Sequence, residues 1–73
     1  MTSSIYLTKK IPADYSAEQA FAMRNAMWDL LETHGAVCDV GIGLGYVDIV
    51  ITDGMSKSDA AKLAKIHKWK VVR

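Results

Sequence analysis

The chain has 73 residues and a formal net charge of +1, with 51% hydrophobic and 23% charged residues. This composition is typical of one small globular domain over residues 1–73 and excludes a disordered chain. No apolar run is long enough to cross a bilayer, and the first residues lack the charged leader and apolar run of a signal peptide, so we expect a cytoplasmic protein without a membrane segment. Cys38 is the only cysteine, which excludes an intrachain disulfide.

The near-neutral total hides a separation of charge along the chain. Seven of the eight acidic residues lie between Asp14 and Asp53, whereas six of the nine basic residues lie between Lys57 and Arg73. We therefore expect a charge-divided surface, which bears on the choice of partner more than on the fold.

The chain begins with a predicted strand and a predicted helix. Apolar and polar residues alternate from Ser4 to Ile11, which predicts a half-buried strand that ends at Pro12. Ser16 and Gln19 have the spacing of a capping box, so a helix should begin there. Gly35 is the expected end of this helix.

Two short strands follow, over Ala36–Ile42 and Tyr46–Thr52. Their apolar residues share one face if Ile42 lies opposite Val47, and this register leaves Leu44-Gly45 as a two-residue hairpin turn. The closely spaced glycines at 41, 43 and 45 precede a strand and not a helix, so we interpret them as part of the hairpin and not as a phosphate-binding loop.

The last part of the chain predicts a second helix and a final strand. Ser56 and Asp59 have a capping-box-like spacing, the helix should run to about His67, and Trp69–Val72 would form a short strand. The order β-α-β-β-α-β predicts an α+β fold, the ferredoxin-like split unit: a four-stranded antiparallel sheet with two helices on one face. Its other sheet face would be open.

No set of residues indicates a reaction. His34, Cys38 and Asp39 lie close in sequence, but strand alternation turns Cys38 inward and Asp39 outward, so we expect an inert buried thiol. His34, Cys38 and His67 are too few and too scattered for a metal site. We therefore predict a protein that is not an enzyme, with no catalytic residues, no metal and no cofactor.

The second predicted helix carries an outer stripe of lysines, Lys62, Lys65 and Lys68. Three interpretations are open: the lysines form ion pairs with the first helix, they are simply solvated, or they contact an acidic partner or phosphates. The acids available on the first helix are Glu18, Asp29 and Glu32.

Tyr6 and Tyr46 should lie on the open sheet face, on the two central strands. Here the chain resembles the RNA-recognition-motif family, through Ile5-Tyr6-Leu7 and Gly45-Tyr46-Val47-Asp48-Ile49. The resemblance implies that both tyrosines stack on bases. Lys70 and Arg73, in the basic C-terminal segment, complete this candidate nucleic-acid site. The family pattern has a second aromatic residue where Asp48 stands and a basic residue where Leu44 stands.

The leading prediction is a non-enzymatic protein-binding module, such as a small inhibitor, adaptor or regulator of viral or mobile-element origin. Phe21 and Trp28 lie at the rim of the wide apolar arc of the first helix. There they either anchor a partner protein, which in a homodimer would be a second copy of the chain, or complete the core against the second helix. Lys62, Lys65 and Lys68 would steer the partner. The alternative is binding of single-stranded RNA on the open sheet face.

Overall fold

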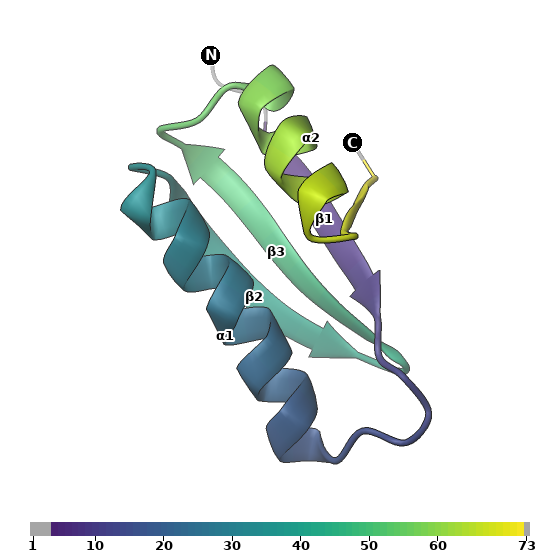
Figure 1. Cartoon of the computed structure of the whole chain (residues 1–73). Helices are drawn as coiled ribbons and strands as arrows, with labels where there is room; N and C mark the ends of the chain where they lie inside the picture. The colour runs from purple at the N-terminus through teal and green to yellow at the C-terminus, as the bar shows by residue number, and fades with distance from the viewer. Residues whose placement is uncertain (1–3, 73) are drawn as a thin grey trace.

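The computed structural model describes residues 4–72 and contains four strands and two helices (Figure 1). The elements are β1 (Ile5–Lys10), α1 (Ala17–Thr33), β2 (Val37–Gly43), β3 (Tyr46–Asp53), α2 (Lys57–Ile66) and β4 (Lys70–Val71). The predicted succession of strands and helices is confirmed, although β4 is only two residues long.

The four strands form one antiparallel sheet in the order β2-β3-β1-β4. The predicted hairpin register is confirmed, because Ile42 lies opposite Val47 and Gly43 pairs with Tyr46. The turn is Leu44–Gly45, in which Gly45 has a φ of +80°. β3 and β1 are the two central strands, and β2 and β4 form the edges.

The predicted capping residues begin both helices. At α1, the N–H of Gln19 donates to Ser16 Oγ at 3.2 Å, and the N–H of Ser16 donates to Gln19 Oε1 at 2.8 Å, which completes the capping box. At α2, the N–H of Asp59 donates to Ser56 Oγ at 3.2 Å. These bonds satisfy backbone donors that a helix N-terminus leaves unpaired.

Both helices end in the Schellman motif, in which the chain turns through a left-handed residue. After α1, the N–H of Ala36 donates to the carbonyl oxygen five residues earlier at 3.0 Å, around Gly35 with a φ of +88°. After α2, the N–H of Trp69 makes the same bond at 2.7 Å, around Lys68 with a φ of +62°. Lys68 is therefore a lysine at a position that usually holds glycine.

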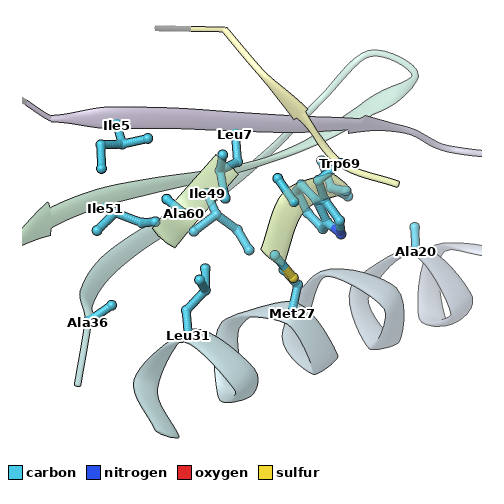
Figure 2. Packing of buried hydrophobic residues seen from close by; sticks show 12 residues of the cluster. Ile5, Leu7, Ala20, Met27, Leu31, Ala36, Ile49, Ile51, Ala60 and Trp69 are labelled. Carbon is cyan, nitrogen blue, oxygen red and sulfur yellow. The ribbon is translucent and has the colours of Figure 1, made fainter. Parts of the chain in front are cut away.

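The core lies between one face of the sheet and the two helices (Figure 1, Figure 2). α1 covers β2 and β3, whereas α2 covers β1 and β4. Trp69, at the end of the lysine stripe, belongs to this core with 6% of its surface exposed. The core residues are Ile5, Leu7, Ala20, Met27, Leu31, Ala36, Val47, Ile49, Ile51, Ala60, Ala64 and Trp69.

Candidate functional site

The two helices lie over the same face of the sheet without packing against each other. Within the described residues, no Cα atom of α1 lies within 8 Å of a Cα atom of α2. Helices that pack side by side have their axes about 8–10 Å apart, which brings such atoms closer. Figure 1 shows β3 in the space between the two helices. Each helix is thus held by its own strands, and side chains alone fill the region between them.

Two hollows lie in this region, and each is lined by residues from both helical segments. One, of about 510 Å³, lies between the end of α1 and the start of α2, where His34, Met55 and Leu63 contribute to its wall. The other, of about 340 Å³, lies between the middle of α1 and the end of α2, where Met23 and Trp69 contribute. We call the two hollows together the interhelical groove.

Methionine is the characteristic residue of the groove. All three methionines of residues 4–72 line it, namely Met23, Met27 and Met55. Figure 2 shows the Met27 side chain and the Trp69 ring pointing toward one another across the core. A methionine side chain is flexible and polarizable, so it adapts to different shapes and makes favourable contacts with aromatic rings. The second hollow therefore has a largely apolar and adaptable lining, whereas Ser56, Asp59 and Lys62 give the first hollow a mixed one.

The α2 edge of the first hollow combines an apolar, a basic and an acidic residue, namely Leu63, Lys62 and Asp59. Leu63 and Lys62 line the first hollow, and Ile66 follows them by three and four residues, so it lies on the same side of the helix. Ile66 is 70% exposed, which is unusual for a large aliphatic side chain beside a core. Ile66 thus places a large apolar side chain in solvent on the same side of α2 as this hollow.

The lysines of the predicted stripe lie on α2 or just after it, and all are exposed. Among the described residues, Lys62, Lys65 and Lys68 form no ion pair with the acids of α1. The separation of the two helices explains this result and removes the first of the three interpretations. Lys9 has a structural role instead, because its Nζ donates to the carbonyl oxygen of His67 at 2.9 Å and so links β1 to the end of α2.

Phe21 and Trp28, the predicted apolar anchors, are not among the residues that line the groove. Phe21 is exposed, and the guanidinium of Arg24 lies 5.0 Å from the centre of its ring. Trp28 is half-buried and packs against the core, where its indole Nε1 is buried and has no hydrogen-bond partner among residues 4–72. The structure thus separates the two aromatic residues from the two hollows beside α2.

Tyr6 and Tyr46, the residues of the predicted RNA site, both lie on the open face of the sheet and are partly exposed. The register places Tyr6 opposite Val50 and Tyr46 opposite Lys10. The two tyrosines are therefore four positions apart along the pair of strands, about 13 Å at 3.3 Å per residue. One base cannot contact both rings at this separation.

An acid lies between the two tyrosines on that face. Asp48 is opposite Thr8 on β1 and lines a shallow hollow together with Tyr6. Lys70 lies opposite Thr8 on the other side, in β4, and is exposed. Arg73 lies outside the described residues. The open face thus combines one acidic and one basic residue near the tyrosines, and the carboxylate repels phosphate.

Cys38 is half-buried on β2, on the same face as the core residue Ile51 that it opposes. Burial, with a smaller effect of the nearby Glu32 and Asp39 carboxylates, raises the pKa of its thiol. The thiolate is the reactive form, so this environment favours an unreactive thiol. Between residues 4 and 72, no three His, Cys, Asp or Glu side chains come together in a way that could hold a metal ion.

Comparison with known proteins gave no match to a family model, to a curated protein or to a solved structure. Within the described part of the chain, no helix is long and apolar enough to cross a membrane.

Sequence reasoning placed the candidate site on individual residues and missed the groove. The signal that was available is the distribution of methionine, at positions 23, 27 and 55, beside the basic second helix. The sequence does not give the distance between the two helices, and this distance decides whether the methionine side chains fill a core or line an open surface.

Proposed function

We propose that the chain is a non-enzymatic protein-binding module, a small inhibitor, adaptor or regulator acting in the cytoplasm, which binds its partner through the interhelical groove and the lysines of α2. The observation that carries this proposal is the separation of α1 and α2, which leaves apolar side chains of both helical segments at an open surface. An apolar surface bordered by charges is typical of sites that bind proteins.

The chemistry of the groove supports a protein partner. Methionine and aromatic residues are enriched in protein interfaces, where they fill pockets of the partner and carry much of the binding energy. Met23, Met55 and Ile66 supply such contacts without belonging to the fully buried core. The lysines beside them would increase the association rate with an acidic partner and suppress binding to a basic one.

We infer that the fold behind this surface is the ferredoxin-like split unit. The strand order β2-β3-β1-β4, with each helix inserted between two strands that run in the same direction, supports this inference. In such a unit each helix packs on its own pair of strands, so a line between the two helices divides the helix layer in two.

The test is an affinity capture from a lysate of the native host, with and without nuclease, followed by mass spectrometry. It compares the wild-type chain with the variant Lys62→Glu/Lys65→Glu/Lys68→Glu. We expect a defined protein that survives nuclease treatment and is lost from the variant, with binding that weakens as the salt concentration rises.

The matched control is Lys10→Glu/Lys57→Glu/Lys70→Glu, which changes the net charge by the same amount at exposed positions away from the groove. Equal losses in both variants would show that total charge, and not the groove, determines binding. Capture that depends on intact nucleic acid in the wild type would contradict the proposal.

Single-stranded RNA binding on the open sheet face is the alternative proposal. The exposure of both Tyr6 and Tyr46 on that face supports it, whereas the Asp48 carboxylate weighs against it. Replacing either tyrosine by alanine should then reduce oligonucleotide affinity by about 1–3 kcal/mol, because each ring would stack on one base. Unchanged affinity in both variants would eliminate this alternative.

We also propose that Phe21 and Trp28 form a contact surface on the other side of α1. This surface would bind a partner protein or a second copy of the chain. Phe21 supports this role through its exposure. Phe21→Ala should therefore weaken self-association measured by analytical ultracentrifugation, and a strictly monomeric wild type would exclude the homodimer.

A further inference from the structure

Resting on the proposed contact surface of Phe21 and Trp28, we infer that β2 pairs with β2 of a second copy of the chain. The two strands run antiparallel with Val40 on the two-fold axis, so the two sheets join into one and α1 packs beside α1 of the copy. Three features support this pairing: the free edge of β2, the sequence of β2, and the flank of α1 above it.

β2 is a long strand with an unpaired edge. It has seven residues, and within residues 4–72 its only neighbour in the sheet is β3. The other edge strand, β4, has two residues. Val37 and Ile42 of β2 are 57% and 45% exposed, so this edge also leaves two large aliphatic side chains in solvent. A long edge strand with exposed apolar side chains is a template for pairing with another chain.

Every second residue of β2 directs its backbone N–H and C=O away from the sheet. The N–H of Ile11, just after β1, donates to the carbonyl oxygen of Gly45 at 2.8 Å, so Gly45 faces β1. These directions alternate along an antiparallel strand, so the next residue, Tyr46, faces β2 and its partner Gly43. The same alternation in β2 gives the residues whose backbone groups face the free edge, namely Cys38, Val40 and Ile42.

The sequence of β2 is complementary to itself about Val40. In this register Val40 meets Val40 of the copy and Cys38 meets Ile42, so all the outward-facing residues of β2 have a partner. A charge on an edge strand normally opposes pairing. Here Asp39 lies opposite Gly41 of the copy, so its carboxylate meets neither a like charge nor a bulky side chain. A register with Asp39 on the axis would place two carboxylates opposite each other, which is destabilising.

One flank of α1 lies over the free edge of β2. Leu30 lines the second hollow, on the side of α2. Trp28 is two residues earlier, about 200° around the helix, and so lies on the other side, together with Phe21 seven residues before it. Burial raises the pKa of the Cys38 thiol, and the nearby carboxylate of Glu32 on α1 adds to this effect. The flank with Phe21, Trp28 and Glu32 therefore faces β2.

The same two-fold axis brings opposite charges of α1 together. Glu32 lies near Cys38, Val40 is about 7 Å further along β2, and α1 runs in the opposite direction. Trp28, about 6 Å back along α1 from Glu32, is therefore level with Val40. Because α1 of the copy runs antiparallel, residues four before and four after Trp28 face each other across the axis. These residues are Arg24 and Glu32, which attract each other and give two ion pairs.

The first measurement is sedimentation equilibrium of the full chain at increasing concentration, for which we expect a monomer–dimer equilibrium. Val40→Pro removes an outward N–H from an edge strand, where a monomer tolerates proline, and should weaken the dimer at least about tenfold. The matched control is Val71→Pro at the other edge of the sheet. The N–H of Val72 donates to Tyr6, so the N–H of Val71 faces outward, and this variant should still dimerise. Circular dichroism checks that both variants are folded.

Cysteine cross-linking tests the register. Two variants in a Cys38→Ser background, one with Asp39→Cys and one with Gly41→Cys, are oxidised separately and as a mixture. A Cβ atom at Gly41 meets no other atom within 4 Å. Directly opposite residues of this kind have Cα atoms about 4.5 Å apart, which a disulfide spans. Two copies of the same position are diagonal neighbours about 7–8 Å apart, so only the mixture should form a covalent dimer.

Charge reversal tests the contact between the two copies of α1. Arg24→Glu alone, or Glu32→Arg alone, should weaken the dimer about tenfold, because both ion pairs become contacts between like charges. The double variant Arg24→Glu/Glu32→Arg should recover the wild-type dissociation constant. This recovery distinguishes a contact across the interface from a loss of folding.

The outcomes separate this inference from the proposed function. A dimer that survives Val40→Pro, that cross-links through one position alone, or that the double charge reversal does not restore would overturn the pairing about Val40. A chain that is monomeric at every concentration would overturn it as well. Each of these results leaves the binding of another protein to be decided by affinity capture. Capture that depends on nucleic acid would contradict the proposed function and would not affect the dimer.

Discussion

Replacing Gly54 by alanine tests the packing between the two helix junctions most directly. Gly54 lies in the turn between β3 and α2 and has a φ of +83°. A Cβ atom there would overlap the carbonyl oxygen of Gly35, and it would lie 3.0 Å from the Gly35 carbonyl carbon and 3.1 Å from the Cα of Ala36. These neighbours are backbone atoms, so no side-chain rotation relieves the contact.

Gly35 is a matched control, because it has a similar φ of +88° but open space where its Cβ would be. Gly35→Ala should therefore cost only the left-handed conformation, about 1 kcal/mol. Gly54→Ala should cost the same amount plus about 1–3 kcal/mol for the overlap. A domain of this size has a total stability of roughly 4–11 kcal/mol, so the second variant loses a large part of it.

The assay is urea unfolding followed by far-UV circular dichroism and tryptophan fluorescence, with thermal unfolding as a second measurement. Each 1 kcal/mol should lower the midpoint temperature by about 4–8 °C in a domain of this size. Gly54→Ala should therefore unfold well below Gly35→Ala. Equal midpoints for the two variants, or a larger loss for Gly35→Ala, would refute the close contact between the two junctions.

Three further predictions concern other parts of the chain. Lys68→Gly should leave the free energy of unfolding unchanged or raise it by up to about 1 kcal/mol, because glycine relieves the left-handed residue but loses a cation at the C-terminus of α2. The control Lys65→Gly, inside α2, should lower it by about 1 kcal/mol, and a loss of similar size in Lys68→Gly would contradict the reasoning. Ser16→Ala should lower it by about 0.5–2 kcal/mol in the same urea titration, because the capping box of α1 loses its side-chain acceptor, and a change within error would show that solvent replaces the cap. The raised pKa of Cys38 should slow alkylation of its thiol at mildly alkaline pH relative to the urea-unfolded chain, and equal alkylation rates in both states would contradict the shift. Because the folded state holds the thiol proton more tightly, the contribution of Cys38 to the free energy of unfolding should be complete below the pKa of the unfolded state and should fall as pH rises through the pKa of the folded state.

Local patterns predicted the secondary structure well because each depends on few neighbouring residues. Ser16 with Gln19 identified the start of α1, and the parity of Ile42 and Val47 identified the register of the hairpin. Alternation and capping are properties of the backbone, so they needed no knowledge of distant contacts. The four-stranded antiparallel sheet with two helices follows from the order of these elements.

Two features of the candidate site could not be predicted in this way. The distance between α1 and α2 depends on how each helix packs on the sheet, which is a tertiary property. The left-handed Lys68 was missed because no glycine marks the end of α2, as Gly35 marks the end of α1. The available warning was the succession His67-Lys68-Trp69, where the chain must turn sharply to bury Trp69.

The separation of the helices also bears on how the molecule moves. α1 is attached to β2 and β3 and α2 to β1 and β4, so the pairing of β1 with β3 along six residues is the main connection between the two halves. A small change in sheet twist at this pairing would move one helix relative to the other, opposed only by the side-chain contacts of the shared core. The width of the groove would then change together with the twist of the sheet. Amide hydrogen exchange should show the two halves opening as separate units, and the half that contains the two-residue β4 should exchange first.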